Sequence, residues 1–439
     1  MDSREGDRGN RRLLAISWGM PPVLLPRAIQ VPRTLKALAG LGWDITVVHA
    51  DGCLISPRTP RDAFLTQHFG DQCRRFPVRL PWPLDRGITH RLLGKFRLGE
   101  AVWRRLGRRK AMELLEREPF DAMITFAQPW GDHLIGLDVC RRRKLPWVAH
   151  FSDPWVDNPL LHGADRKRLP AWREQEKAVI READAAVFTT EYTVALVMRK
   201  YPRDWRDKVF VVPHGYDPTL LRFLGAPERS RRLRMVLTGN FYEGRTPMPL
   251  LLALEELNRS LPLRDQLEVL IAGAHNERYE AVAAEKGLGE IVWFRRSVPF
   301  LESLALSHSA DVLLVIDAPH AEASAFLPSK LVDYLMFEKP ILGITPLRGA
   351  SAQLLGELGC PVAAPEDIAG ISHAVSGLLE QWRTGVLAVG SGFRAVARRF
   401  EISLVTRKLD EILRGAISKT ELPDGRPGRP LQAEGLPYR

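Results

Sequence analysis

The sequence is poor in cysteine, and the cysteines that it has are scattered. Cys53, Cys73, Cys140 and Cys360 are the four among 439 residues, and no two of them form a C-x-x-C pair. A disulfide framework and a structural zinc site both need clustered cysteines, so this spacing predicts neither. The pattern favours a reducing compartment, in which these side chains serve as small hydrophobic core residues.

Long hydrophobic runs are also missing. No apolar segment reaches the roughly 18 residues that a membrane-spanning helix needs. Residues 13–16 follow two arginines, as they would in a signal peptide, but Trp18, Gly19 and Pro21-Pro22 interrupt the run and no cleavage pattern follows. We therefore expect an intracellular protein, cytoplasmic or held peripherally at the inner face of the membrane.

What is present is a periodic α/β pattern that occurs twice. A buried strand at 13–17, a helix at 26–41 and a strand at 45–49 form one βαβ unit, which implies a parallel sheet. After a polar, basic stretch the alternation restarts, with strands predicted at 235–238 and 267–272. The chain exceeds the size of one hydrophobic core, so two Rossmann-like domains facing a central cleft are expected. The predicted parts are an N-terminal domain (1–226), a linker (227–233), a C-terminal domain (234–395), a helical segment packing back on the N-terminal domain (396–418) and a disordered tail (419–439).

The net charge of +11 is concentrated in a few basic clusters. One lies in a long helix predicted over about 92–116, and two interpretations of it are open: a solvated helix face, or a surface attracted to anionic lipid headgroups. Nucleic acid is disfavoured as a partner, because no recognisable binding motif and no basic stripe interleaved with aromatics occurs. The clusters are Arg104, Arg105, Arg108, Arg109 and Lys110; residues 141–144; and Arg229, Arg231, Arg232 and Arg234.

One segment of the second domain places a cation at a predicted helix start. Ser329 is a good N-cap for a helix over 330–337, so free backbone N–H groups lie beside Lys330. Such an arrangement suits a diphosphate, and the carboxylate of Asp333, one turn further, suits a ribose hydroxyl pair. Taken alone, Lys330 and Asp333 are better explained as a surface ion pair at i,i+3.

Several segments, taken together, resemble a known family. Residues 326–343 resemble the donor-binding motif of retaining GT-B glycosyltransferases of family 4, and residues 236–247 (VLTGNFYEGRTP) look like the opening of their C-terminal domain. Residues 211–217 (VVPHGYD), 187–192 and 147–155 are similar to segments that precede the linker in that family. The resemblance extends over most of the chain.

The resemblance implies a GT-B enzyme that transfers a sugar from a nucleotide-sugar donor to a saccharide or lipid-linked acceptor. The donor would be a substrate, no metal or other cofactor is expected, and the N-terminal domain would face the acceptor. Arg245 and Lys330 would neutralise the leaving diphosphate, and Gly239 would let the backbone approach it. The implied donor-binding set is Gly239, Asn240, Arg245, Ser329, Lys330 and Asp333.

One position departs from the family's pattern. The family often has two glutamates eight residues apart, whereas Asp333 occupies the second position and Ala325 the first. This departure leaves open a variant with different donor recognition, or an inactive relative.

On the opposite side of the cleft, His150 ends an apolar strand and Asp153 lies in the loop after it. A core histidine and a contact to the donor sugar or its phosphate are equally open for His150. Together with Arg245 and Lys330, these two residues form the predicted catalytic set.

Two further functional classes stay open. Nucleotide-sugar 2-epimerases share the two-domain architecture, and a non-catalytic nucleotide-sugar-binding protein would tolerate Ala325. A dehydrogenase is disfavoured because no G-x-G-x-x-G follows a predicted strand. The sequence names neither the base and sugar of the donor nor the acceptor, because a few pocket contacts decide them.

Overall fold

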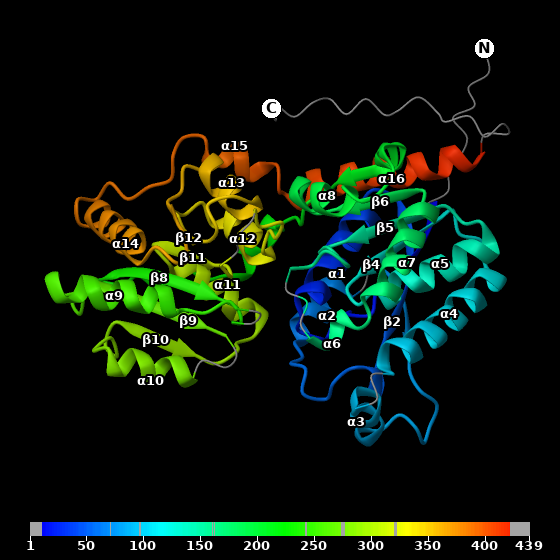
Figure 1. Cartoon of the computed structure of the whole chain (residues 1–439), viewed down its shortest axis with the longest axis horizontal. Helices are drawn as coiled ribbons and strands as arrows, with labels where there is room; N and C mark the ends of the chain where they lie inside the picture. The colour runs from blue at the N-terminus through cyan, green and yellow to red at the C-terminus, as the bar shows by residue number, and fades with distance from the viewer. Residues whose placement is uncertain are drawn as a thin grey trace, which may run out of the picture.

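Two parallel β-sheets, one after the other along the chain, form two domains that lie side by side (Figure 1). The structure is a computed structural model that describes residues 11–70, 72–95, 98–159, 161, 163–241, 244–273, 277–319 and 323–421. Of the predicted disordered tail, residues 422–439 lie outside this range.

In the described residues, the N-terminal sheet has seven strands in the order β3-β2-β1-β4-β5-β6-β7, and every pair is parallel. The strands are β1 (Arg11–Ile16), β2 (Trp43–Ala50), β3 (Arg74–Val78), β4 (Ala122–Ala127), β5 (Trp147–Phe151), β6 (Ala185–Phe188) and β7 (Val209–Val211). The helices are α1 (Pro26–Ala39), α2 (Ala63–Phe69), α3 (Gly87–Lys95), α4 (Gly99–Arg117), α5 (Gly131–Arg143), α6 (Gly163–Arg166), α7 (Leu169–Glu182) and α8 (Glu191–Met198), with the 3-10 turns η1 (Gly52–Leu54), η2 (Arg203–Lys208) and η3 (Pro218–Phe223).

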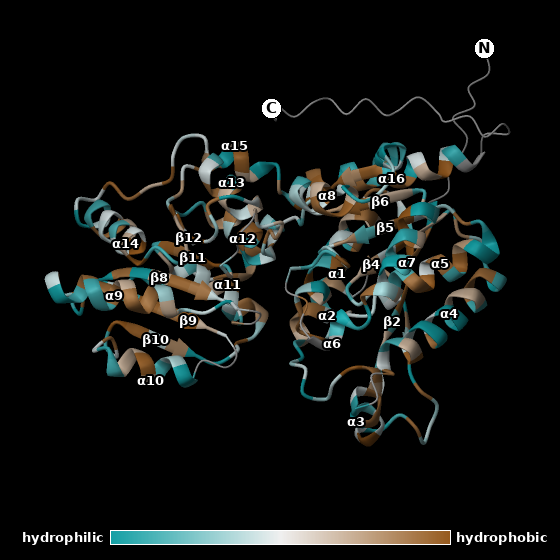
Figure 2. Ribbon diagram, in the orientation of Figure 1, coloured by the Kyte–Doolittle hydropathy of each residue, from teal (hydrophilic) through white to brown (hydrophobic). Residues whose placement is uncertain are grey.

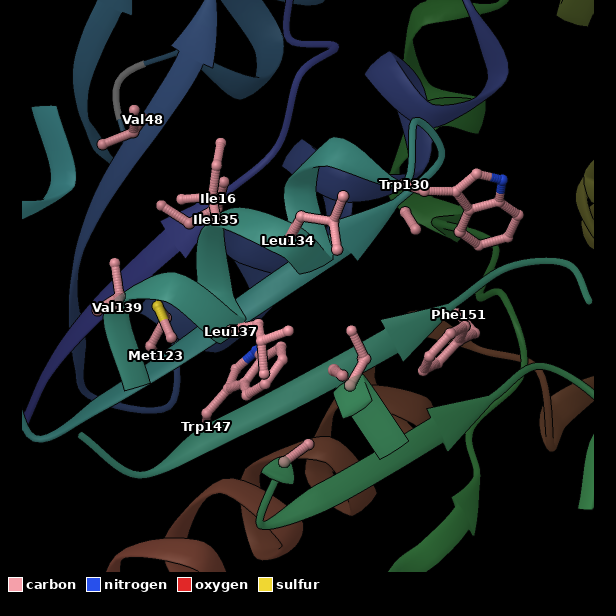
Figure 3. Close-up of a cluster of buried hydrophobic side chains, with 14 of the residues drawn as sticks. Ile16, Val48, Met123, Trp130, Leu134, Ile135, Leu137, Val139, Trp147 and Phe151 are labelled. Atoms are coloured by element: carbon pink, nitrogen blue, oxygen red, sulfur yellow. The ribbon is translucent and has the colours of Figure 1, made fainter. Parts of the chain in front are cut away.

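Both faces of this sheet are buried, which explains its continuous apolar strands. Along β1, Leu14 and Ile16 join a core with α4, α5 and α7, while Leu13 and Ala15 join a second core on the opposite face. The alternation follows from the two-residue period of a strand. Figure 3 shows α5 side chains such as Ile135 packed over β1, β4 and β5.

The C-terminal sheet of the described chain has six strands in the order β10-β9-β8-β11-β12-β13, again all parallel. The strands are β8 (Leu233–Thr238), β9 (Leu267–Ala272), β10 (Val292–Arg295), β11 (Val312–Ile316), β12 (Ile341–Ile344) and β13 (Val362–Ala363). The helices are α9 (Met248–Ser260), α10 (Glu277–Glu285), α11 (Phe300–Ser309), α12 (Ser329–Tyr334) with the 3-10 turn η4 (Leu335–Phe337), α13 (Ala350–Glu357), α14 (Ile368–Arg383), α15 (Phe393–Arg398) and α16 (Ile402–Glu421).

The last helix, α16, returns to the N-terminal domain, where Figure 1 shows it in red. Its buried side chains recur at helical spacing and complete the core under β1 and α1, as an amphipathic helix requires. Trp43 donates a hydrogen bond from Nε1 to Asp410 on α16, at 2.7 Å. The buried residues of α16 are Val405, Leu409, Ile412, Leu413, Ala416 and Ile417.

Two predicted helices differ from the structure. The helix predicted over about 92–116 is two helices, since α3 ends at Lys95 and α4 begins at Gly99. Gly94 and Gly99 lie at this break, and a glycine inside a helix costs about 1 kcal/mol relative to alanine. The helix predicted over 330–337 is the short α12, which continues as η4.

Candidate active site

A cavity of about 790 Å³ lies between the two domains. Its walls come from loops after strands of both sheets, because the carboxyl ends of parallel strands meet at one edge of a sheet. Residues of the predicted site line it together with residues that the sequence did not single out. The residues that line it include Arg27, Asp153, His214, Gly239, Asn240, Arg245, Ser329, Lys330 and Asp333.

The turn after β8 brings Gly239 directly under Lys330. Gly239 has φ +134°, and a Cβ at this position would lie 2.5 Å from the Nζ of Lys330. Any other residue would therefore displace the ammonium and strain the backbone. Gly273, after β9, packs against the carbonyl of Gly239, where a side chain has no room. The two glycines hold the Lys330 ammonium at the cavity wall.

Lys330 is a half-buried cation whose ammonium makes no hydrogen bond or ion pair with another described residue. Burial and, to a smaller extent, the neighbouring Arg245 guanidinium lower the pKa of Lys330 to about 8, against the opposing effect of the Asp317 carboxylate. Two cations held together beside a cavity repel each other. A polyanion bound between them would relieve that repulsion.

A buried carboxylate holds Arg245. Asp317 follows β11, and its Oδ1 lies 3.5 Å from the Nε of Arg245. Its Oδ2 accepts hydrogen bonds from the hydroxyls of Thr345 at 3.0 Å and Ser351 at 2.9 Å. Because these bonds fix the carboxylate, they also orient the guanidinium. Sequence reasoning missed Asp317, although an acid directly after the apolar run 312–316 is a local signal for it.

The predicted cap of α12 is wrong. Pro328 is the N-cap, Ser329 is the first helical residue, and no side chain caps the helix. The extended conformation of Pro328 starts the helix instead, and its carbonyl accepts from the amides of Leu331 and Val332. Ser329 still lines the cavity, as does the exposed Asn240.

Asp333 faces the other domain rather than Lys330. Its Oδ1 accepts a hydrogen bond from the Nη1 of Arg33 on α1, at 2.6 Å. The same Nη1 donates to the carbonyl of Gly215 at 2.7 Å. Burial raises the pKa of Asp333, and the Arg33 guanidinium opposes that rise. Asp333 therefore combines a place in the cavity wall with an ion pair that joins the two domains.

The structure separates the two residues predicted on the N-terminal side. Asp153 lines the main cavity, and burial raises its pKa against the opposing effects of the Ser152 hydroxyl, Arg27 and Arg245. His150 lies behind it, beside a second cavity of only about 10 Å³. Burial holds the pKa of His150 well below its ordinary value, so the imidazole is neutral. Its position is that of a core histidine.

Arg27 is a cavity residue that the sequence analysis missed. It lies in the first turn of α1, and its Nε and Nη2 are buried without a hydrogen-bond partner among the described residues. Burial lowers the pKa of Arg27 to about 10, opposed by Asp153 and Asp132. The only local signal was a basic residue at a helix start after Pro26, and such residues are common.

A family model matches part of the N-terminal half of the chain. Residues 29–220 are similar to the model of Glycosyltransferase Family 4. The chain has the GT-B fold. The predicted fold class, two Rossmann-like domains facing a cleft, is confirmed.

Solved structures share the fold at low sequence identity. Sucrose-phosphate synthase from Thermosynechococcus elongatus has a TM-score of 0.69 and 16% identity, over 93% of this chain and 99% of that one. A putative UDP-N-acetylglucosamine 2-epimerase from Listeria monocytogenes has a TM-score of 0.56 and 11% sequence identity, over 95% of this chain and 99% of that one. WaaG, a glycosyltransferase involved in lipopolysaccharide biosynthesis, has a TM-score of 0.52 and 16% sequence identity, over 92% of this chain and 100% of that one. No curated protein sequence matches.

The position at which the sequence departs from the pattern of family 4 glycosyltransferases is a junction between the domains. Ala325 is 4% exposed and does not line the cavity. Its carbonyl accepts hydrogen bonds from the hydroxyls of Thr190 at 2.9 Å and Thr193 at 3.2 Å, both on the N-terminal side. A glutamate at this site would be placed in a tightly packed contact.

The described residues contain neither a candidate metal-binding cluster nor a candidate membrane-spanning helix. No group of three or more His, Cys, Asp and Glu side chains is placed to hold a metal ion. No helix combines the length and the apolar character that crossing a membrane requires.

Proposed function

We propose that this protein is a glycosyltransferase that moves a sugar from a nucleotide-diphosphate-sugar donor to a saccharide or lipid-linked acceptor, with retention of configuration. Its role would be in the synthesis of a cell-surface polysaccharide or glycolipid, the kind of pathway in which WaaG takes part. One observation carries the proposal. Lys330 and Arg245 converge over the Gly239 turn, at the wall of an interdomain cavity that can hold a large ligand.

The donor's diphosphate binds between Lys330 and Arg245, where each unit of negative charge relieves the repulsion between the two cations. Gly239 and Asn240 line the approach to it, and Ser329 lies at the start of α12 beside Lys330. Asp333 accepts a hydrogen bond from a donor hydroxyl through the oxygen that Arg33 leaves open.

In the reaction, the bond between the anomeric carbon and the diphosphate oxygen breaks, and the diphosphate leaves with the electron pair. The acceptor oxygen forms the new bond from the same face, and its proton passes to the departing phosphate oxygen. Lys330 and Arg245 stabilise the charge that develops on the diphosphate. Asp153, on the opposite wall, orients a sugar hydroxyl. No protein nucleophile is required.

The nucleotide-sugar 2-epimerase remains the alternative, and the Listeria neighbour keeps it in view. An epimerase would turn over the donor without any acceptor. A non-catalytic binding protein would bind the nucleotide and release no product.

The first test is thermal unfolding with UDP, GDP, ADP, CDP and their sugar conjugates. We expect one nucleotide family to raise the unfolding temperature of the wild type. Lys330→Ala should lose most of that rise, and Lys286→Ala, which removes a lysine paired with Glu255 on the surface of the same domain, should keep it. No shift with any nucleotide, or equal shifts in both variants, would contradict the proposal.

A further inference from the structure

Part of the N-terminal domain, residues 82–95 and 98, exposes an unusual amount of apolar side chain. Five of the ten large hydrophobic side chains that are exposed in the described chain lie in these fifteen residues. Isolated exposed apolar residues need no explanation, whereas a group of them indicates an interaction surface. They are Trp82 (78% exposed), Leu84 (53%), Ile88 (66%), Leu92 (48%) and Leu98 (49%).

The segment is anchored on its inner side only. His90 shares a hydrogen bond of 2.9 Å between its Nδ1 and the carbonyl of Cys53, and Leu93 packs against the core. In contrast, none of the residues of α3 is buried. Figure 1 shows α3 at the margin of the N-terminal domain, apart from the sheet, and Figure 2 shows apolar residues on it. No described element covers its outer side.

The charge around this apolar surface is positive. Helix α3 has no acidic residue, and Arg91 on it is exposed. Asp85, before the helix, is the acidic residue of the segment, and its carboxylate accepts a hydrogen bond from the backbone amide of Cys53. Arg86 is exposed and stacks over the Trp82 ring, with 4.6 Å between the guanidinium carbon and the ring centroid. An apolar helix with tryptophan and basic residues at its border is typical of a helix that lies in a membrane interface. Anionic lipid headgroups add attraction to each basic residue.

Helix α4, which contains the basic cluster of the long predicted helix, fits this role less well. Arg104 and Arg108 pair with Asp138 on α5, so part of its charge is neutralised within the domain. No large hydrophobic side chain of α4 is exposed in the described chain, because its apolar face packs against α5. Charge without exposed apolar area gives only weak attraction to a membrane that salt readily screens.

We propose that the described residues 82–95 and 98 dock the protein on an anionic lipid surface, with Trp82, Ile88 and Leu92 inserted among the headgroups and Arg86 and Arg91 paired with lipid phosphates. The segment follows the carboxyl end of β3, at the sheet edge that also faces the interdomain cavity. Docking would therefore bring the cavity near the membrane. The use of this position to reach a lipid-linked acceptor rests on the proposed function, whereas the docking itself does not.

The test is sedimentation of the full-length protein with phosphatidylcholine vesicles that contain or lack phosphatidylglycerol. We expect the wild type to bind the vesicles with phosphatidylglycerol, and added salt to weaken binding. Trp82→Ser/Ile88→Asn should lower partitioning at least about tenfold, because it removes inserted apolar area. Arg86→Glu/Arg91→Glu should lose the preference for phosphatidylglycerol.

Matched controls make the result specific. Leu347→Ser removes a side chain that is 64% exposed on the C-terminal domain, and Arg105→Glu/Arg109→Glu reverses two exposed charges on α4. Both should partition like the wild type. All variants should unfold at the wild-type temperature, because the altered side chains are exposed.

Three outcomes would overturn the proposal. In the first, the wild type binds neither kind of vesicle. In the second, the α4 variant loses vesicle binding while the variants of the apolar segment (Trp82→Ser/Ile88→Asn and Arg86→Glu/Arg91→Glu) keep it. Alternatively, the wild type would be a dimer that Trp82→Ser/Ile88→Asn dissociates, which would assign the surface to self-association. Nucleotide-induced thermal shifts of the same variants separate this failure from a failure of the proposed function, since the nucleotide site is in the other domain.

Discussion

The two sides of the cleft are built differently. On the C-terminal side, Lys330 and Arg245 are two cations held by a glycine turn and one fixed carboxylate. On the N-terminal side, Arg27 and Asp153 oppose each other's pKa shifts, so that wall carries little net charge. This difference agrees with the proposed function, in which the positively charged wall stabilises a departing diphosphate and the opposite wall orients the acceptor.

Among the described residues, one ion pair links the two walls. Arg33 is 3% exposed, and its Nη1 reaches Asp333 across the domain boundary. The hydrogen bonds from Thr190 and Thr193 to the carbonyl of Ala325 form a second link. The arrangement of the cavity therefore depends on contacts between the domains. Substitutions that remove charge from each wall in turn test whether the two walls have different roles.

The largest effect is expected from Lys330→Ala. Removing a cation that stabilises the leaving group should lower the rate of sugar transfer by about 10²-fold to 10³-fold. Its unfolding temperature should stay close to that of the wild type, because no described residue pairs with the ammonium. Lys286→Ala is the control for steady-state transfer assays. A near-normal rate of sugar transfer by Lys330→Ala would contradict the proposal that Lys330 binds the diphosphate of the donor.

Arg33→Ala tests the link between the walls. It leaves the buried Asp333 carboxylate without its cation, which should lower the free energy of unfolding by about 3 kcal/mol in denaturant titrations. Asp333→Asn in the same background should recover part of the loss. Arg394→Ala, which breaks an exposed pair with Glu338, should cost less than about 1 kcal/mol. Equal losses of unfolding free energy in Arg33→Ala and Arg394→Ala would mean that the interdomain pair stabilises the protein no more than an exposed pair does.

Arg27→Ala should separate the walls most clearly. We expect sugar transfer to fall by about tenfold to a hundredfold, since a buried charged donor is lost from the acceptor side. The thermal shift caused by the nucleotide should not change, because Lys330 and Arg245 remain. Should Arg27→Ala abolish the nucleotide shift as completely as Lys330→Ala does, the division between the walls would be wrong.

The smallest predicted effect is a pH dependence of nucleotide affinity. Burial lowers the pKa of Lys330 to about 8, so in the free protein the ammonium is charged below that pH and neutral above it. Affinity should accordingly fall as the pH rises through 8, by about tenfold at one unit above the pKa. Titrations of nucleotide binding at about pH 7 and about pH 9 check this. Lys330→Ala, which has no group to titrate there, should show no such fall.

The strands were predicted well, and the details at helix ends were not. The strand predicted at 267–272 has the observed bounds, and the strands predicted at 45–49 and 235–238 lie within β2 and β8, because each segment is mainly apolar and buried on both faces of its sheet. The break between α3 and α4 and the start of α12 at Ser329 were missed. A glycine or a serine near a helix end is compatible with several local arrangements, and tertiary contacts choose among them.

The candidate site divides in the same way. Gly239, Arg245 and Lys330 could be found because they stand in short segments directly after strands or before a helix. Arg33 and Asp333 are 300 residues apart, and no local pattern indicates that they meet. The same holds for Asp317, whose importance depends on the position of Arg245.

By itself, the sequence determined the α/β alternation, the two parallel sheets and the place of Lys330 near the start of a helix, since hydrophobic periodicity and helix-start signals are local properties of the chain. Only the tertiary structure decided that Asp333 pairs with Arg33, that His150 lies behind the cavity and that Arg27 lies at its wall. It also decided that the exposed apolar side chains of residues 82–95 and 98 stay uncovered by other described elements. The physical reason is that burial and long-range pairing depend on which surfaces the folded chain brings together, and the spacing of residues along the chain does not record this.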